Sequence, residues 1–326
     1  MNRRESEPLD LDALLQELQA GQDAQPEPEG FRSGYVAVVG QPNVGKSTLM
    51  NRLIGQKVAI VSPKPQTTRR RILGILTRED AQLMFVDTPG IHDAFHKLGE
   101  YMNTMALSSI PDADVVLFVV EGVTSPNEMD REIAAQLARF DGPKLLLVNK
   151  IDQIEQELAA HRFEQYAALG EWAEVLPISA LEGHGVEGVI DRVVQYLPEG
   201  PRYYPEGQVT DQTEREIAAE IVREAALRHL EQEVPHSINV VADEWTERPN
   251  GVTYISATIF VERDTQKGIV IGQGGKMLKR ISSEARAEIE RELGVQVYLD
   301  LWVKVRDRWR NSDSWLNRWG YKPDNS

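Results

Sequence analysis

Residues 35–55 have the sequence YVAVVGQPNVGKSTLMNRLIG, which is the most specific pattern in the chain. An apolar run leads directly into a glycine-bounded turn, and a helical pattern follows the turn. The turn has the spacing G-x-x-x-x-G-K-S in the strand–loop–helix context that a phosphate-binding loop requires. Its residues are Gly40, Gln41, Pro42, Asn43, Val44, Gly45, Lys46 and Ser47, and Thr48 follows on the helix. We therefore predict a nucleotide site in which Lys46 reaches the β- and γ-phosphates and Ser47 binds Mg²⁺.

The rest of the N-terminal half alternates short apolar runs with helical patterns. The runs lie at residues 35–39, 82–87, 114–120, 144–149 and 174–179. Their near-continuous hydrophobicity suits strands that are buried on both faces of a parallel sheet. Residues 69–80 alternate more regularly and predict an antiparallel edge strand. We expect a doubly wound, mostly parallel α/β phosphate-loop domain over residues 31–197.

Composition divides the remaining chain into three parts. Residues 1–30 are acidic and rich in Pro and Glu, which is typical of a disordered tail, although Leu11, Leu14, Leu15 and Leu18 have helical spacing. Residues 198–210 have the Pro/Gly composition of a linker. Residues 211–326 show the order α-β-β-α-β, which predicts a second, small α+β domain.

Charge and composition limit the classes of function. A net charge of −15 excludes a wholly cationic nucleic-acid coat, and the absence of cysteine excludes disulfides, thiolate metal sites and a cysteine nucleophile. There is no stretch of 18 apolar residues and no signal-peptide core, so we expect a soluble, cytoplasmic protein. Residues 263–326 differ from the rest, with 13 Lys and Arg against nine Asp and Glu and four of the six tryptophans. This end favours a locally held anionic partner.

A second phosphate-side element follows the run at residues 82–87. That strand ends with Asp87, Thr88, Pro89 and Gly90, and the Asp87 carboxylate at its end can reach Mg²⁺. After a phosphate loop, Gly90 is expected to sense the γ-phosphate through its N–H.

Two later loops predict which base is bound. Asp152, in the sequence N-K-I-D, can accept hydrogen bonds from N1–H and the N2 amino group of guanine, whereas adenine offers neither donor at that edge. Asn149 is expected to brace the loop and contact the base, with the Lys150 stem packed on the ring, and the Ala180 N–H to bind guanine O6. A site of this kind discriminates by roughly 10⁴-fold because the wrong base leaves polar groups unpaired. The predicted base-binding residues are Asn149, Lys150, Asp152, Ser179, Ala180 and Leu181, and the nucleotide is GTP.

Over about residues 31–322 these motifs resemble those of translation-factor-related GTPases, and among them the Era family. The resemblance implies that QTTRRR, residues 66–71, is the first switch. We place its ligand for metal and γ-phosphate at Thr68, with Thr67 as the close alternative. The implied metal ligands are Ser47, Thr68 and Asp87, and the implied cofactor is Mg²⁺.

The position that holds a water-orienting glutamine in many small GTPases is Ile91, whose side chain can neither donate nor accept a hydrogen bond. We therefore expect slow intrinsic hydrolysis, and no residue is assigned as a general base. Transition-state support is expected from Lys46, Thr68, Gly90 and Asn43. Asn43 matches an asparagine that in related GTPases helps to hold K⁺; the alternative is a turn residue that tolerates left-handed geometry.

The C-terminal domain contains Gly272-Gln273-Gly274-Gly275, a G-x-x-G loop between the run IVI and a helix. It resembles an α-first KH domain, whose loop clamps the backbone of about four unpaired nucleotides. The residues expected to bind RNA are Gly272, Gln273, Gly274, Gly275, Lys276, Lys267, Lys279, Arg280, Arg306 and Arg308. Ile269, Ile271 and Leu278 are expected to line the base-binding groove.

The final stretch, residues 301–321, alternates Trp with Lys and Arg. We expect Trp302 to pack against the KH core. For Arg306, Arg308, Arg310 and Trp309, contact with RNA and packing within the protein remain open alternatives.

By resemblance, the chain is a GTP switch that binds the 3′ end of small-subunit ribosomal RNA and acts in rRNA processing and small ribosomal subunit biogenesis. The alternative is a membrane-surface GTPase of the cell-cycle or stress type, with weak peripheral contact at the inner face of the cell membrane. We expect a monomer in either case.

Overall fold

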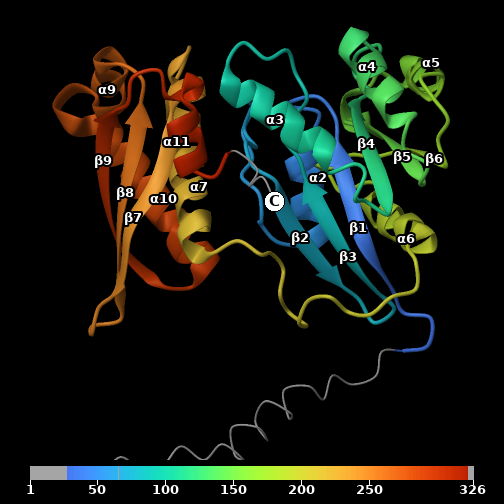
Figure 1. Ribbon diagram of the computed structural model, residues 1–326, viewed down its shortest axis with the longest axis horizontal. Helices are drawn as coiled ribbons and strands as arrows, with labels where there is room; N and C mark the ends of the chain where they lie inside the picture. Colours follow the sequence, from blue (N-terminus) through green and yellow to red (C-terminus); the bar gives the residue numbers. More distant parts are fainter. Residues whose placement is uncertain (1–27, 65, 322–326) are drawn as a thin grey trace, which may run out of the picture.

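The computed structural model describes residues 28–64 and 66–321, so the helix suggested by Leu11–Leu18 lies outside the described residues. Figure 1 shows two units side by side, joined by a segment that runs past the lower end of the first. Among the described helices, none has the length and apolar character needed to cross a bilayer.

The first unit is built on a six-stranded sheet in the order β2-β3-β1-β4-β5-β6. All neighbouring pairs are parallel except β2 with β3, which is antiparallel. This confirms the doubly wound, mostly parallel fold and the antiparallel edge strand. The strands are β1 (Arg32–Val39), β2 (Ile72–Thr77), β3 (Ala81–Asp87), β4 (Val115–Glu121), β5 (Lys144–Asn149) and β6 (Glu174–Pro177).

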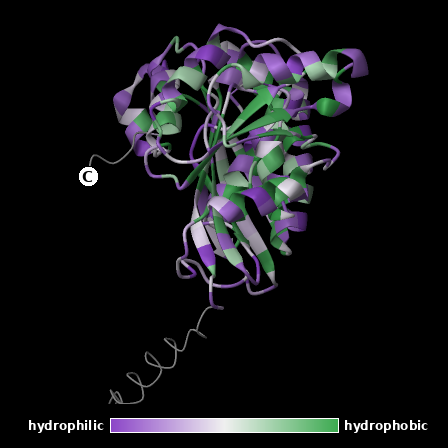
Figure 2. Ribbon diagram, turned by 90° about the vertical axis from the view of Figure 1, so that its right-hand side faces the viewer, coloured by the Kyte–Doolittle hydropathy of each residue, from purple (hydrophilic) through white to green (hydrophobic). Residues whose placement is uncertain are grey.

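Helices cover both faces of this sheet. Along β1, Val36 and Val38 pack against α2 and α6, whereas Ala37 and Val39 pack with α3, α4 and α5. Because both faces are buried, the strands need apolar residues at successive positions, and Figure 2 shows the hydrophobic residues gathered at the centre of the fold. The helices are α2 (Lys46–Ile54), α3 (Lys97–Ser108), α4 (Glu128–Leu137), η1 (Ile151–Gln153), α5 (Gln156–Ala167) and α6 (Val186–Tyr196).

The second unit has a three-stranded sheet, β7-β8-β9, in which β7 and β8 are antiparallel and β8 and β9 are parallel. α7, α9 and α10 contribute to one apolar core with this sheet. The elements are α7 (Glu214–His229), α8 (Val234–Ser237), β7 (Asn239–Glu247), β8 (Val252–Val261), α9 (Asp264–Ile271), η2 (Gln273–Gly275), α10 (Lys276–Leu293), β9 (Gln296–Val305), η3 (Trp309–Asn311) and α11 (Asp313–Arg318).

The predicted order α-β-β-α-β is wrong at α9, because the run IVI belongs to a helix and the G-x-x-G loop joins two helices. The carboxamide oxygen of Gln266 accepts hydrogen bonds from the backbone N–H groups of Glu262 and Arg263, at 2.9 and 3.1 Å, and caps this helix. Branched residues favour strands by propensity, but only Val270 of the run is fully buried. Packing of Val270 against the domain core therefore outweighs the strand propensity of this run.

Residues 198–210 lie along the first unit. The carbonyl oxygen of Val209 accepts a hydrogen bond from the Ile75 N–H at 2.8 Å, and Thr210 forms an isolated bridge with Gly74. Gln82 accepts hydrogen bonds from the N–H groups of Tyr203 and Tyr204. The segment is thus attached to the outer strand β2 and to β3.

Three C-terminal tryptophans, Trp309, Trp315 and Trp319, pack between the two units. Trp309, Leu316 and Trp319 form an apolar cluster with Leu98 and Met102 of α3. In Figure 1, α11 lies on the side of the second unit that faces the first. Trp309 is fully buried and its Nε1–H donates to the Ser237 carbonyl, so packing, not base stacking, is its role in this structure.

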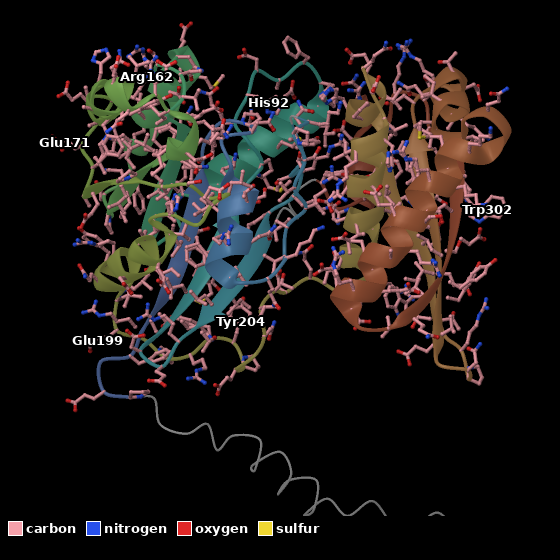
Figure 3. All side chains as sticks on the ribbon, turned by 180° about the vertical axis from the view of Figure 1, so that it is seen from behind. His92, Arg162, Glu171, Glu199, Tyr204 and Trp302 are labelled. Carbon is pink, nitrogen blue, oxygen red and sulfur yellow. The ribbon has the colours of Figure 1, made fainter. Side chains whose placement is uncertain are left out.

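The expectation for Trp302 is wrong. Its side chain is 55% exposed and donates from Nε1 to Asp300 at 3.1 Å. Alternation along β9 turns Val303 into the core and Trp302 toward the opposite face of the sheet, and Figure 3 shows Trp302 at the outer edge of the molecule.

Candidate functional site

The phosphate loop connects β1 to α2 and has the strained backbone that its glycines allow. Gly40, Asn43 and Gly45 have φ of 151°, 64° and 103°. A Cβ on Gly40 would lie 2.3 Å from the Val119 carbonyl oxygen, and one on Gly45 would lie 2.3 Å from Asn149 Nδ2. Larger residues at either position would push the loop away from its neighbours.

Lys46 is directed into this loop. Its ammonium group donates to the carbonyl oxygens of Gly40 and Gln41, at 3.0 and 2.8 Å. Burial lowers the pKa of Lys46 to about 8, and this effect exceeds the opposing attraction of Asp87. A buried ammonium with only carbonyl partners is prepared to bind an anion.

Side-chain oxygens from three elements meet beside Lys46. Ser47 Oγ lies 2.7 Å from both Asp87 Oδ2 and Thr68 Oγ1, and Thr68 Oγ1 lies 3.3 Å from Asp87 Oδ2. Asp87 is fully buried, its Oδ1 has no hydrogen-bond partner among the described residues, and burial raises its pKa. Two hydroxyls and a buried carboxylate are donors that Mg²⁺ prefers.

Thr67, the alternative to Thr68, is directed elsewhere. Its hydroxyl donates to the Lys64 carbonyl oxygen at 2.6 Å. The structure therefore brings Thr68, and not Thr67, to Ser47 and Asp87.

The segment after Asp87 packs closely on the phosphate loop. A Cβ on Gly90 would lie 2.6 Å from the Pro42 nitrogen, and the Ile91 N–H donates to the Gly40 carbonyl at 3.2 Å. The Ile91 side chain is buried in the core. His92, which the sequence did not single out, donates from Nδ1 to the Gly90 carbonyl oxygen at 2.8 Å. Its Nε2 lies 2.8 Å from Gln66 Nε2, so His92 connects this segment to residues 66–71.

The predicted base-binding residues surround the same end of the sheet. Asn149 is buried; its Nδ2 donates to Val44 O at 2.7 Å and its Oδ1 accepts the Ala180 N–H at 2.9 Å. Asn149 therefore does brace the phosphate loop against the loop that follows β6. Because the Ala180 N–H already has this partner, its predicted bond to guanine O6 would require the N–H to be shared or the Asn149 amide to move.

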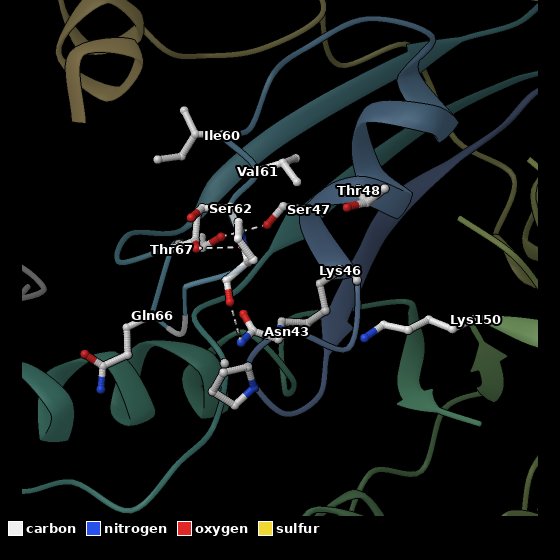
Figure 4. A pocket seen from close by; sticks show the side chains of 15 residues that line it. Asn43, Lys46, Ser47, Thr48, Ile60, Val61, Ser62, Gln66, Thr67 and Lys150 are labelled. Carbon is white, nitrogen blue, oxygen red and sulfur yellow. Dashed lines mark hydrogen bonds between the residues drawn. The ribbon is translucent and has the colours of Figure 1, made fainter. Parts of the chain in front are cut away.

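The other base-side residues are more accessible. Asp152 and Leu181 are exposed, and Ser179 is buried. Lys150 has φ of 64° and its Nζ donates to Glu121 at 2.8 Å. Together with the phosphate loop and residues of the 60–68 segment, Lys150 lines a cavity of about 240 Å³, which Figure 4 shows from close by.

The G-x-x-G loop forms a second candidate site, at the start of α10. Gly272, Gly274 and Gly275 have φ of 71°, 61° and 78°, and a Cβ on Gly274 or Gly275 would meet open space. Their backbone conformation, not crowding, therefore requires glycine. Gln273, Lys276, Lys279 and Arg280 are exposed around the loop, and Lys267 is partly buried.

The remaining predicted RNA contacts are less uniform. Ile269 is 49% exposed, whereas Ile271 and Leu278 pack partly into the domain core. Arg308 is exposed, with φ of 43°. The Arg306 guanidinium lies over the rings of Phe260 and Trp315, at 5.5 and 5.0 Å, and Arg310 pairs with Glu262 at 2.6 Å. Arg306 and Arg310 thus have partners within the protein.

Comparison with known proteins gives the family. A model described as 50S ribosome-binding GTPase matches residues 35–150, and a KH-domain model matches residues 233–310. GTPase Era of Alkaliphilus oremlandii is 48% identical over 292 residues, which cover 89% of this chain and 99% of that protein. The chain belongs to the Era family of GTPases.

Other Era-family proteins match this chain with similar identity and coverage. GTPase Era of Ruminiclostridium cellulolyticum is 46% identical over 90% of this chain and 98% of its own length. Two solved structures each match at 39% identity, covering 90% of this chain and all of theirs: Era in complex with MgGDPNP and nucleotides 1506–1542 of 16S ribosomal RNA, with a TM-score of 0.84, and a variant of Aquifex aeolicus Era bound to GDP·AlF4⁻, with a TM-score of 0.86. This similarity also confirms the pairing of a GTPase domain with a KH domain.

Proposed function

We propose that this chain is a GTP-hydrolysing switch that binds the 3′ end of small-subunit ribosomal RNA in the cytoplasm and acts in rRNA processing and small-subunit biogenesis. The observation that carries the proposal is the presence on one chain of a complete phosphate site and a G-x-x-G loop with exposed cations. A related protein of the same family has been solved with MgGDPNP and a 16S rRNA fragment bound together.

We assign Mg²⁺ to Ser47, Thr68 and Asp87. Their oxygens already converge, and the second carboxylate oxygen of Asp87 is buried without a partner among the described residues. When bound there, Mg²⁺ supplies positive charge against the phosphate oxygens.

The chain's own residues bind and orient the triphosphate. Lys46 would exchange the carbonyl oxygens of Gly40 and Gln41 for phosphate oxygens. The N–H of Gly90, a residue that packs on Pro42 of the phosphate loop, would bind the γ-phosphate. Ile91 is buried and offers no polar atom to a water molecule, so unaided hydrolysis is slow.

We also propose that Asn43 helps to hold K⁺ beside the phosphates. Its Nδ2 donates to Pro63 O at 3.2 Å, which fixes the amide at the mouth of the cavity. Its φ of 64° shows that Asn43 also has the left-handed conformation of the alternative, turn-forming role. The two roles are compatible.

The proposal is tested by crosslinking the protein to RNA in cells and sequencing the attached RNA. Reads should concentrate at the 3′ end of the small-subunit rRNA and should be lost in Gly274→Asp, which places a carboxylate where phosphate must approach. Reads distributed over unrelated RNA, or retained in the variant, would contradict the assignment.

A further inference from the structure

Thr68, the proposed metal ligand, follows Thr67, whose main chain is hydrogen-bonded to the KH domain. Arg223, in α7, is 1% exposed, and its Nη2 donates to the main-chain oxygen of Thr67. The same guanidinium is paired with Glu220, at 3.0 Å from Nε to Oε1 and 2.5 Å from Nη2 to Oε2. The pairing matters because a buried guanidinium without a carboxylate would be strongly unfavourable.

The residue on the other side of Thr68 is held by the same domain. The Arg69 guanidinium is 3% exposed and donates to the carbonyl oxygens of Ile238 at 2.5 Å and His236 at 3.0 Å, at the end of α8. It also lies over the ring of Trp309, 5.9 Å from the centroid.

Between these two anchors lies Thr68, whose side chain faces the oxygen cluster of the metal site. Its hydroxyl contacts Ser47 and Asp87, whereas Thr67 and Arg69 are fixed to the second domain. A third contact supports the same segment: the Val61 N–H donates to Glu224, one position after Arg223, at 3.0 Å.

We propose that Arg223 is a positioning residue for the metal site, acting from the KH domain through the Thr67 peptide to keep the Thr68 hydroxyl beside Ser47 and Asp87. The inference rests on the proposed role of Thr68 as a metal ligand. In this arrangement, docking of the two domains and Mg²⁺ binding are coupled. By linkage, docking must raise the Mg²⁺ affinity by the same factor by which Mg²⁺ raises the docking equilibrium constant.

A double-mutant cycle tests the inference. Single-turnover GTP hydrolysis is measured across a Mg²⁺ titration for the parent, Thr68→Ala, Arg223→Met and the double variant. Arg223→Met should raise the Mg²⁺ concentration at half-maximal rate by about tenfold, the effect of one charge-assisted hydrogen bond. Because Arg223 acts through Thr68, the double variant should be no worse than Thr68→Ala alone.

The possible outcomes separate the inference from the function on which it rests. If Thr68→Ala leaves the Mg²⁺ dependence unchanged, the metal role of Thr68 is wrong and the inference is lost with it. If Thr68→Ala shifts the dependence but Arg223→Met does not, or if the two effects add, only the positioning role is overturned.

Two further variants separate positioning from general stability. Arg223→Lys keeps the charge and should recover part of the Mg²⁺ affinity. Tyr101→Phe removes another hydrogen bond across the interface, from Tyr101 Oη to Asp313, without touching residues 66–71. Tyr101→Phe should leave the Mg²⁺ dependence unchanged. If the Mg²⁺ concentration at half-maximal rate instead rises in every variant in proportion to its loss of thermal stability, the role of Arg223 is only structural.

Discussion

The ammonium nitrogen of Lys46 lies 3.0 Å from the carbonyl oxygen of Gly40, turned into the loop to which both residues belong. Only 6% of Lys46 is exposed, and burial lowers its pKa from 10.5 to about 8. Near neutral pH the nucleotide-free protein therefore carries a protonated amine in a place that disfavours its charge. A bound phosphate would offset the cost of burying this charge.

Lys46→Met should consequently stabilise the nucleotide-free protein at pH 7 while abolishing nucleotide binding. The expected gain is about 3 kcal/mol, because the pKa falls from 10.5 to about 8 on folding and one pKa unit corresponds to about 1.36 kcal/mol. Between these two pH values the unfolded chain binds more protons than the folded one, so the parent gains stability as pH rises and the difference disappears above pH 10.5. Urea unfolding at a series of pH values measures this.

Lys304→Met, at an exposed position of β9, is the control and should follow the parent at every pH. A difference between parent and Lys46→Met that does not vary with pH would show that desolvation of the amine is not its cause.

Asp152→Asn should change base preference from guanine toward xanthine. The amide would place a donor against the donors of guanine, whereas xanthine offers an acceptor there. Because Asp152 is exposed, thermal stability should not change. Competition between GTP and XTP gives the preference, and unchanged GTP affinity would refute the base assignment.

Hydrolysis should be faster in K⁺ than in Na⁺ at equal ionic strength, and Asn43→Gly should remove the difference. Glycine is the informative substitution because Asn43 has φ of 64°, where alanine would add strain of roughly 1 kcal/mol. Equal rates of the parent in the two salts would leave Asn43 with only its turn-forming role.

Gly274→Asp should weaken RNA binding by roughly 1–3 kcal/mol and reduce its salt dependence, with GTP affinity unchanged. Gly294→Asp is a closely matched control: Gly274 and Gly294 have φ of 61° and 68°, and a Cβ at either meets open space. Gly294 lies at the other end of the 18-residue helix α10, about 27 Å away. Equal loss of RNA binding in both variants would point to damage of the domain instead of loss of a phosphate contact.

Local patterns predicted the phosphate loop, the buried strands and the G-x-x-G loop because each depends on neighbouring residues. The choice between Thr67 and Thr68 could not be made in this way, since both carry the same hydroxyl. It is the bond from Thr67 to Lys64 O, set by the folded segment, that separates them.

Contacts between the domains also could not be predicted from local patterns, because they join residues that lie far apart in the sequence. Arg69 and Arg223 resemble ordinary surface cations in the sequence, and Trp302 and Trp309 lie in one basic, aromatic stretch, yet Trp302 is exposed and Trp309 fully buried. A hint was present in α7, where Ala218, Ala219, Ala225 and Ala226 flank the charged residues. Small residues on several sides of a helix indicate that it is enclosed by neighbours, so its charges must be paired inside the protein.

The linker that pairs Val209 with Ile75 also occupies the outer side of β2, the last strand of the sheet. A bare edge strand offers its free N–H and C=O groups to any other extended chain and is a common starting point for aggregation. Replacing residues 198–210 with a Gly/Ser sequence of equal length would therefore do more than loosen the tether between domains. It would expose that edge to strand addition from a second molecule, and we expect the altered protein to self-associate more readily than the parent.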